Sequence, residues 1–276
     1  MLSTEREIFR RCQASLRSLK EQGKFPNREN VPEIVNLHYK TMKEDPAYPS
    51  EHFKFLIIDD IIEKLQSGIT TTIGNLKILD AKNTSHLEWL QNKDQSNWIF
   101  SQRHKEYLGE KLGDVFSNKI YDAADAILSR LEDPTRGGPW RRQGLVFGNV
   151  QSGKTTSYAA LVNKAVDAGY KIIIVLGGLN NNLRAQTQEE LEKQFVGRTS
   201  AEDDTKSDII EVGEINSGEK LQVNMATSRD EKKGDFNKNK FNAIKDINLN
   251  DDPILFVIKK NTSSLANVIS YFQSRI

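Results

Sequence analysis

The feature that most constrains this chain is a glycine-rich motif near its middle. Residues 148–155 fit the pattern G-x-x-x-x-G-K-[ST], the phosphate-binding loop of nucleotide triphosphatases. Residues 143–147 before it are an apolar run typical of a short buried strand. Residues 155–167 after it have apolar side chains at helical spacing, and Gly169 stands where a C-terminal cap belongs. The sequence therefore predicts strand, loop and helix in the order that the motif requires.

The residue types in the motif match the chemistry of a bound triphosphate. Glycines let the backbone wrap around a phosphate, while the loop N–H groups and the helix N-terminus point at the anion. Lys154 would bind the β- and γ-phosphates, and Thr155 would place its hydroxyl on Mg²⁺, which makes them the predicted catalytic residues. ATP and Mg²⁺ are the predicted cofactors, with nucleotide contacts expected from Gly148, Asn149, Val150, Gln151, Ser152, Gly153, Lys154, Thr155 and Thr156.

Composition limits what else the chain can be. Among 276 residues, 39 are basic and 38 acidic, so the net charge is only +1 and any contact with nucleic acid must come from a local patch. Cys12 is the only cysteine and lies on the apolar face of a predicted helix, which indicates a core residue. No apolar run reaches membrane-spanning length, so we expect a cytoplasmic protein with no membrane partner.

The pattern of elements changes at the Pro- and Gly-rich residues 133–139. Residues 1–136 predict a mostly α-helical N-terminal domain. In residues 137–276 strands and helices alternate, which is typical of an α/β fold with a parallel sheet. Buried strands are expected at 171–176 and 254–258, short strands at 209–212 and 221–223, and helices at 183–195 and 262–273.

Four blocks of the second part resemble the Z-one domain family. They are residues 140–155, residues 165–188, the Thr227-Ser228-Arg229-Asp230 segment with Asp235-Phe236, and residues 257–261. The family carries an endonuclease label, and its core is similar to a superfamily 2 helicase or translocase motor. The resemblance implies a RecA-like, helicase-type P-loop sheet with helices on both faces. It also implies nucleic acid, DNA in the first instance, and other proteins of restriction or anti-phage defence clusters as partners.

The chain departs from that family near its C-terminus. An acidic Asp-Glu-type segment is expected shortly after the strand and helix of residues 254–273, and no Asp or Glu lies between Pro253 and Ile276. The second motor domain with its arginine finger is also missing. The resemblance therefore implies the N-terminal portion of a longer ATPase, which would bind ATP but hydrolyse it inefficiently by itself.

Two polar segments follow the predicted strands and are candidates for contact with nucleic acid. Helicase-like motors meet the nucleic-acid backbone at these positions, although an ordinary solvated helix start is an equal alternative for the first segment. Because parallel strands place their outgoing loops together, Arg184 should form a small basic surface with Lys259 or Lys260. The candidate residues are Arg184, Gln186, Thr187, Gln188, Lys259, Lys260 and Asn261.

Two other functions remain open from the sequence. An ATP-gated endonuclease could use Asp59 or Asp60 together with the Asp80-Ala81-Lys82 triplet to hold Mg²⁺, although such triplets are frequent by chance. A non-catalytic nucleotide-binding interaction module would need only the phosphate loop. The four histidines, at positions 38, 52, 86 and 104, show no metal-ligand spacing.

Overall fold

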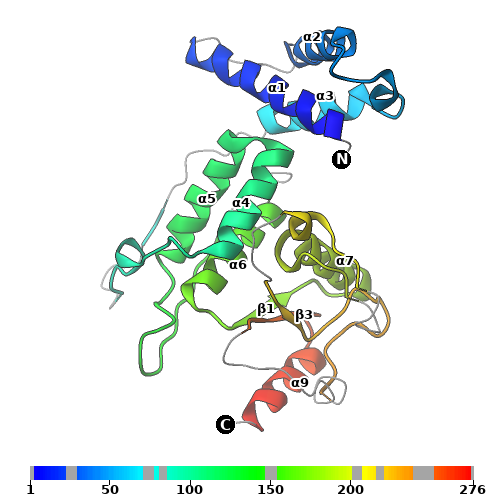
Figure 1. Cartoon of the computed structure of the whole chain (residues 1–276). Coiled ribbons are helices and arrows are strands. Elements are labelled where there is room, and N and C mark those ends of the chain that lie inside the picture. The colour runs from blue at the N-terminus through cyan, green and yellow to red at the C-terminus, as the bar shows by residue number, and fades with distance from the viewer. Residues whose placement is uncertain are drawn as a thin grey trace. The chain divides into compact units, whose positions relative to one another are not determined.

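The computed structural model describes residues 3–22, 30–70, 78–80, 86–146, 154–200, 207–215, 221–238 and 252–274. These residues form a mixed α/β structure that is mostly helical and contains a three-stranded parallel sheet (Figure 1). The chain divides into two compact units. The first consists of Met1–Asp80, Leu108–Ile120 and Val146–Lys154, and the second consists of Ala81–Tyr107, Tyr121–Leu145 and Thr155–Ile276.

The first unit is built from the N-terminal helices, α1 (Ser3–Glu21), α2 (Asn30–Glu44) and α3 (Ile58–Thr70). Their apolar faces form one core, which is the usual way for amphipathic helices to bury their stripes. A short 3₁₀ turn, η1 (Ser50–Phe53), precedes α3. The core consists of Ile8, Phe9, Cys12, Val31, Val35, Met42, Phe53, Ile61 and Leu65.

Cys12 is fully buried in this core, and burial raises the pKa of its thiol to about 12. A thiol with such a pKa carries almost no thiolate at neutral pH, so it is a poor nucleophile. The prediction that Cys12 is a core residue is confirmed.

The helices α4 (Ile99–Leu112) and α5 (Asp114–Leu128) each contribute residues to both units. The predicted boundary at residue 136 therefore does not coincide with the division into compact units. The reason is an apolar cluster that joins the segment before that boundary to helix α6 (Lys154–Ala168). Two of its residues lie at the 3₁₀ turn η2 (Leu90–Asn92), Leu90 in the turn and Trp89 directly before it. The others are Trp98, Leu128, Ala165 and Ala168.

The sheet has the strand order β1-β3-β2, with β1 at Ile172–Leu176, β2 at Asn224–Met225 and β3 at Ile254–Ile258. All pairs are parallel, and β1 pairs with β3 from Ile172↔Ile254 to Leu176↔Ile258. The two strands predicted at 171–176 and 254–258 are confirmed. The strand expected at 221–223 is wrong for those residues, because the strand β2 begins only at Asn224, directly after them. Residues 209–212 form a single antiparallel bridge, Arg198↔Ile209, followed by the 3₁₀ turn η5 (Glu211–Glu214).

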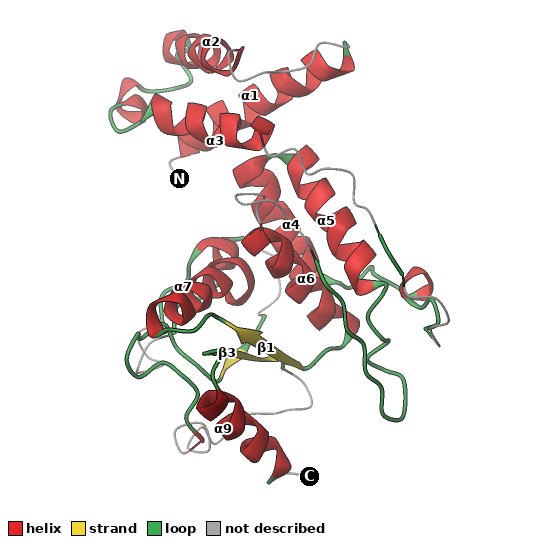
Figure 2. Ribbon diagram, turned by 180° about the vertical axis from the view of Figure 1, so that it is seen from behind, coloured by secondary structure: helices red, strands yellow, loops and turns green. Residues whose placement is uncertain are grey.

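Helices cover both faces of the sheet (Figures 1 and 2). Helices α6 and α7 (Asn181–Leu191), with the π-helical turn η3 (Glu192–Val196), pack against Ile173, Leu255 and Val257. Helix α9 (Thr262–Gln273) packs on the opposite face against Ile254, Phe256 and Ile258. This alternation follows from the strand period of two, which sends successive side chains to opposite faces.

The buried strand predicted at 143–147 is wrong for residues 143–146, which form an exposed loop. Leu145 is 77% exposed and Val146 is 59% exposed. An aliphatic run becomes a strand only where a neighbouring strand satisfies its backbone groups, and no described strand lies beside it. Phe147 lies outside the described residues.

Candidate nucleotide-binding site

Helix α6 begins at the lysine of the glycine-rich motif. Gly148–Gly153 lie outside the described residues, whereas Lys154 opens the helix and Thr155 and Thr156 follow in its first turn, both half-buried. Burial raises the pKa of the Tyr158 hydroxyl, and a hydrogen bond with the side chain of Thr155 opposes that rise. The predicted helix is confirmed, and it begins at the lysine of the motif, as the motif requires. The phosphate loop itself stays a prediction.

The far end of α6 is closed as the sequence indicates. Gly169 has a φ of 115°, a left-handed conformation that favours glycine, and its N–H donates to the carbonyl of Val166 over 3.0 Å. Two residues earlier, Asp167 accepts hydrogen bonds from Phe100 N at 3.1 Å and from Ser101 N at 2.7 Å. Burial raises the pKa of Asp167, although these bonds oppose the shift. The carboxylate therefore caps α4 and holds α6 against it.

The segment that leads to the motif is held by a buried carboxylate. Glu132 forms ion pairs with Arg136 and Arg142, both at 2.8 Å, and its carbonyl accepts a 2.6 Å bond from the Tyr170 hydroxyl. Burial alone would raise the pKa of Glu132, but Arg142 and Arg136 outweigh it and lower the pKa. Glu132 thereby links Arg136 and Arg142 to Tyr170, two residues after the end of α6.

The carboxyl ends of β1 and β3 lie side by side. Gly177 N donates to Ile258 O over 2.9 Å, and Lys260 N donates to Gly178 O over 2.7 Å. Each outgoing helix has an asparagine N-cap: Asn180 accepts a bond from Leu183 N, and Asn261 accepts one from Ser264 N, both at 2.8 Å. The prediction that the two outgoing loops share one edge is confirmed.

The basic surface predicted at this edge is wrong, because Arg184 is fully buried. Its guanidinium donates to the carbonyls of Ser228 at 2.8 Å, Asp230 at 2.6 Å and Gly234 at 3.3 Å. Burial lowers the pKa of Arg184, and nearby carboxylates oppose the shift. Arginine stays protonated despite this shift, and the charged guanidinium of Arg184 stabilises three backbone carbonyls inside the protein.

The other candidates for contact with nucleic acid have mixed positions. Gln188 is buried, Gln186 is exposed, and the Thr187 hydroxyl donates to Leu183 O over 2.8 Å. Lys259 pairs with Asp235 at 3.7 Å, while Lys260 is exposed. Asn261 acts as the helix cap described above. Of the seven residues, Gln186 and Lys260 have side chains that the structure places in the exposed class.

A buried polar network behind this edge was missed by the sequence analysis. Glu192 is fully buried and accepts hydrogen bonds from Gln188 at 3.0 Å, from the Ser200 hydroxyl, and from Arg229 at 2.8 and 2.6 Å. The Thr227 hydroxyl donates to Gln188 over 2.7 Å and accepts from Val257 N over 2.9 Å. The available signal was the four-residue spacing of Gln188 and Glu192 on one helical face.

The described residues considered for a nuclease site do not form a metal-binding cluster. Asp59 and Asp60 lie in the first turn of α3 and are exposed, Asp80 is exposed, and Lys82 lies outside the described residues. Within the described part of the chain, no three His, Cys, Asp or Glu side chains form a group that could hold a metal ion. Mg²⁺ prefers oxygen ligands, so the Thr155 hydroxyl is a described group of the motif that would suit this ion beside a bound nucleotide.

Comparison of the chain with protein-family models, with curated proteins and with solved structures finds no match. Among the described helices, none has both the length and the apolar composition of a segment that spans a bilayer.

Proposed function

We propose that this chain binds ATP and Mg²⁺ through residues 148–155 and is part of a nucleic-acid-dependent ATPase or translocase of the P-loop type. The start of α6 at Lys154 carries the proposal, because the motif requires its lysine and threonine to open a helix. The parallel sheet and the helices on both of its faces support it, since nucleotide sites lie at the carboxyl ends of such strands. A role in restriction or anti-phage defence rests on the resemblance to the Z-one domain family.

Each motif residue has a defined task in this proposal. Lys154 neutralises the β- and γ-phosphates, and the backbone N–H groups of the loop and of the first turn of α6 donate to the phosphate oxygens. Thr155 supplies a hydroxyl to Mg²⁺, which neutralises charge on the phosphates when it is bound. Turnover by this chain should stay near background, because no Asp or Glu lies between Pro253 and Ile276 to hold Mg²⁺ together with Thr155.

The test is calorimetric titration of ATP with Mg²⁺ into the full chain and into Lys154→Ala. The substitution should abolish binding, because it removes the charge that the triphosphate needs, while circular dichroism stays unchanged. Lys171→Ala is the matched control, since Lys171 is an exposed lysine outside the motif, and it should bind ATP as the wild type does. Equal affinity of wild type and Lys154→Ala would contradict the nucleotide site.

A phosphate-release assay separates the proposed ATPase from its alternatives. Wild-type turnover close to that of Lys154→Ala agrees with a chain that binds but hardly hydrolyses ATP. Robust turnover would show that a catalytic acid within these residues has been overlooked. Cleavage of plasmid DNA that disappears on Asp80→Ala, with ATP binding retained, would favour the endonuclease instead.

A further inference from the structure

Residues 228–237 form a loop after β2, and the buried side chain of Arg184 holds its backbone by hydrogen bonds. Arg184 donates to three of its carbonyls from beneath, as described above. The loop also closes on itself, since Ser228 N donates to Gly234 O over 2.9 Å and Gly234 N donates to Asp230 O over 3.0 Å. A Cβ at Gly234 would clash with the backbone carbonyl oxygens of Ser228 and Asp230, so the position accepts only glycine without rearrangement. The backbone of this loop is therefore preorganised.

A second buried charge holds the N-terminal side of the loop. The guanidinium of Arg229 forms its two short bonds with the buried carboxylate of Glu192. Arg229 N in addition donates to the Ser200 hydroxyl over 2.8 Å. The Glu192 carboxylate is fully buried, whereas the Arg229 side chain is 36% exposed, and the two charge-assisted bonds between them hold the loop backbone in place. Because its backbone is already ordered, the loop should lose little conformational entropy when it binds a partner.

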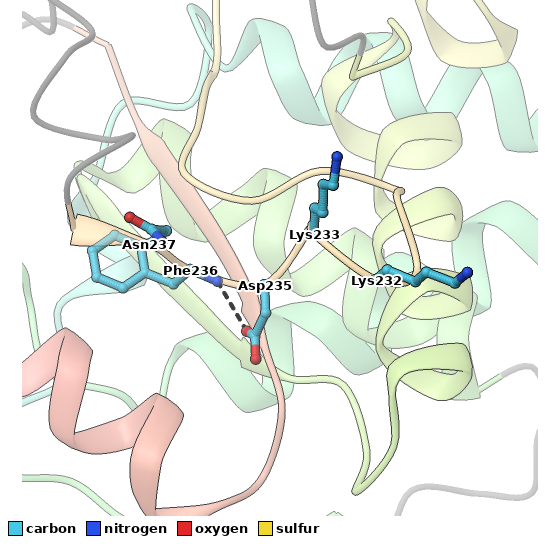
Figure 3. Close-up of a pocket in the computed structure, with 5 residues that line it drawn as sticks. All are labelled: Lys232, Lys233, Asp235, Phe236 and Asn237. Carbon is cyan, nitrogen blue, oxygen red and sulfur yellow. Dashed lines mark hydrogen bonds between the residues drawn. The ribbon is translucent and has the colours of Figure 1, made fainter.

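The loop presents two lysines to solvent. Lys232 and Lys233 are exposed, and within the described part of the chain no carboxylate pairs with either ammonium group. Their own backbone N–H groups donate to Asp230 Oδ1, at 2.9 and 2.5 Å, which turns the loop at that point. In Figure 3 the Lys233 side chain extends upward and the Lys232 side chain to the right, while the buried Phe236 lies at the left. The two lysines and residues 235–237 line a pocket of about 300 Å³.

The neighbouring acids are largely occupied by other groups. Asp235 accepts bonds from Phe236 N at 3.0 Å and from the Ser264 hydroxyl at 2.7 Å, and it pairs with Lys259. This contact also brings Lys259, at the end of β3, next to the loop. The exposed acids of the tip are Asp230, whose carboxylate accepts the backbone bonds from Lys232 and Lys233, and Glu231.

We infer that residues 228–237 form a contact for the phosphate backbone of a nucleic acid, made by the exposed ammonium groups of Lys232 and Lys233. Lysine binds phosphate as a point charge, without the forked geometry that reads a base edge. The buried Phe236 cannot stack on a base, so the contact is expected to be independent of sequence. This inference rests on the proposed function only in taking nucleic acid as the partner.

The experiment measures binding of a short fluorescein-labelled oligodeoxynucleotide of mixed sequence to the full chain, by anisotropy over a series of salt concentrations. Lys232→Ala/Lys233→Ala should weaken binding and reduce the slope of log K against log salt by about one for each lysine. Lys232→Arg/Lys233→Arg should keep both the affinity and the slope, because the charges remain. Lys40→Ala/Lys54→Ala removes two exposed lysines of the first unit and should leave the slope unchanged.

Several results would overturn the inference. They are an unchanged slope in Lys232→Ala/Lys233→Ala, an equal loss in Lys40→Ala/Lys54→Ala, or no binding by the wild type at low salt. Poly-glutamate that competes as well as unlabelled DNA does would point to an acidic protein instead. ATP affinity is measured separately on the same proteins. If the wild type binds ATP but not DNA, this contact is refuted while the nucleotide site is not.

Discussion

Arg184 joins two segments that lie far apart in the sequence, because its guanidinium binds the carbonyl of Asp230, 46 residues away. Arg184→Ala removes this buried cation and leaves three carbonyls without their donor. Such a loss should lower the free energy of unfolding by about 3 kcal/mol. Urea denaturation monitored by circular dichroism measures the change. Gln186→Ala, an exposed position on the same helix, should stay within about 0.5 kcal/mol of the wild type. A similar small effect for Arg184→Ala would mean that the loop is held by other contacts.

His104 makes the second unit sensitive to acid. Its ring is fully buried, Nδ1 lies 2.9 Å from the Tyr121 hydroxyl, and Nε2 has no hydrogen-bond partner among the described residues. The Tyr121 hydroxyl donates to Ser101 O, so Nδ1 carries the proton. Burial lowers the pKa of His104 to about 4 from its ordinary value of 6.5, and the charge of Arg103 adds to the shift, while Gln194 opposes it.

The unfolded chain therefore binds more protons than the folded chain between pH 6.5 and pH 4. Stability should fall as the pH falls through that window, by on the order of 3 kcal/mol from this histidine. Asp167 acts in the opposite direction, because its pKa is raised in the fold. We expect His104→Gln to flatten the slope of unfolding free energy against pH relative to the wild type. Parallel slopes in the two proteins would show that His104 is not the titrating group.

The helices that leave the sheet start at asparagines, and this is an element-scale property of the candidate site. Asn180 and Asn261 each accept a bond from the backbone three residues on, which satisfies an otherwise free N–H group. Asn180→Ala and Asn261→Ala should each lower the free energy of unfolding by about 1 kcal/mol. ATP affinity should not change. Asn182→Ala, in the first turn of α7 but not its cap, is the control and should cause no loss. DNA affinity lost in Asn261→Ala with stability intact would instead support the original prediction for this residue.

At the scale of the whole molecule, β1 is an edge strand of the described sheet. Ile172, Ile174 and Leu176 point to the α9 side and are 42–44% exposed, whereas their partners on β3 are fully covered by α9. Exposed edges of uncharged aliphatic strands template association between chains. We therefore expect the isolated chain to be marginally soluble.

Ile174→Thr should raise the concentration at which light scattering begins, because it keeps a β-branched residue and makes the exposed face polar. Ile173→Thr is the matched control, since Ile173 points to the opposite, buried face and its replacement should destabilise the fold. Unchanged scattering in Ile174→Thr would show that association uses another surface.

The sequence alone predicted those elements whose backbone conformation is determined by neighbouring residues. The β-branched runs at 171–176 and 254–258, the helix after the motif and the glycine cap at Gly169 all formed as predicted. Their signals are local, because strand and helix periodicity and a left-handed glycine are properties of neighbouring residues. The lysine and threonine of the motif were likewise correctly placed at a helix N-terminus.

Tertiary structure decided which side chains are covered and which strands find partners. Arg184 looked like a surface cation, and it is buried because a loop more than 40 residues later folds over it. Residues 143–146 have a strand composition but no neighbouring strand to pair with, and they remain a loop. Exposure and strand pairing depend on contacts between segments distant in sequence, and hydrophobic periodicity carries no information about those contacts.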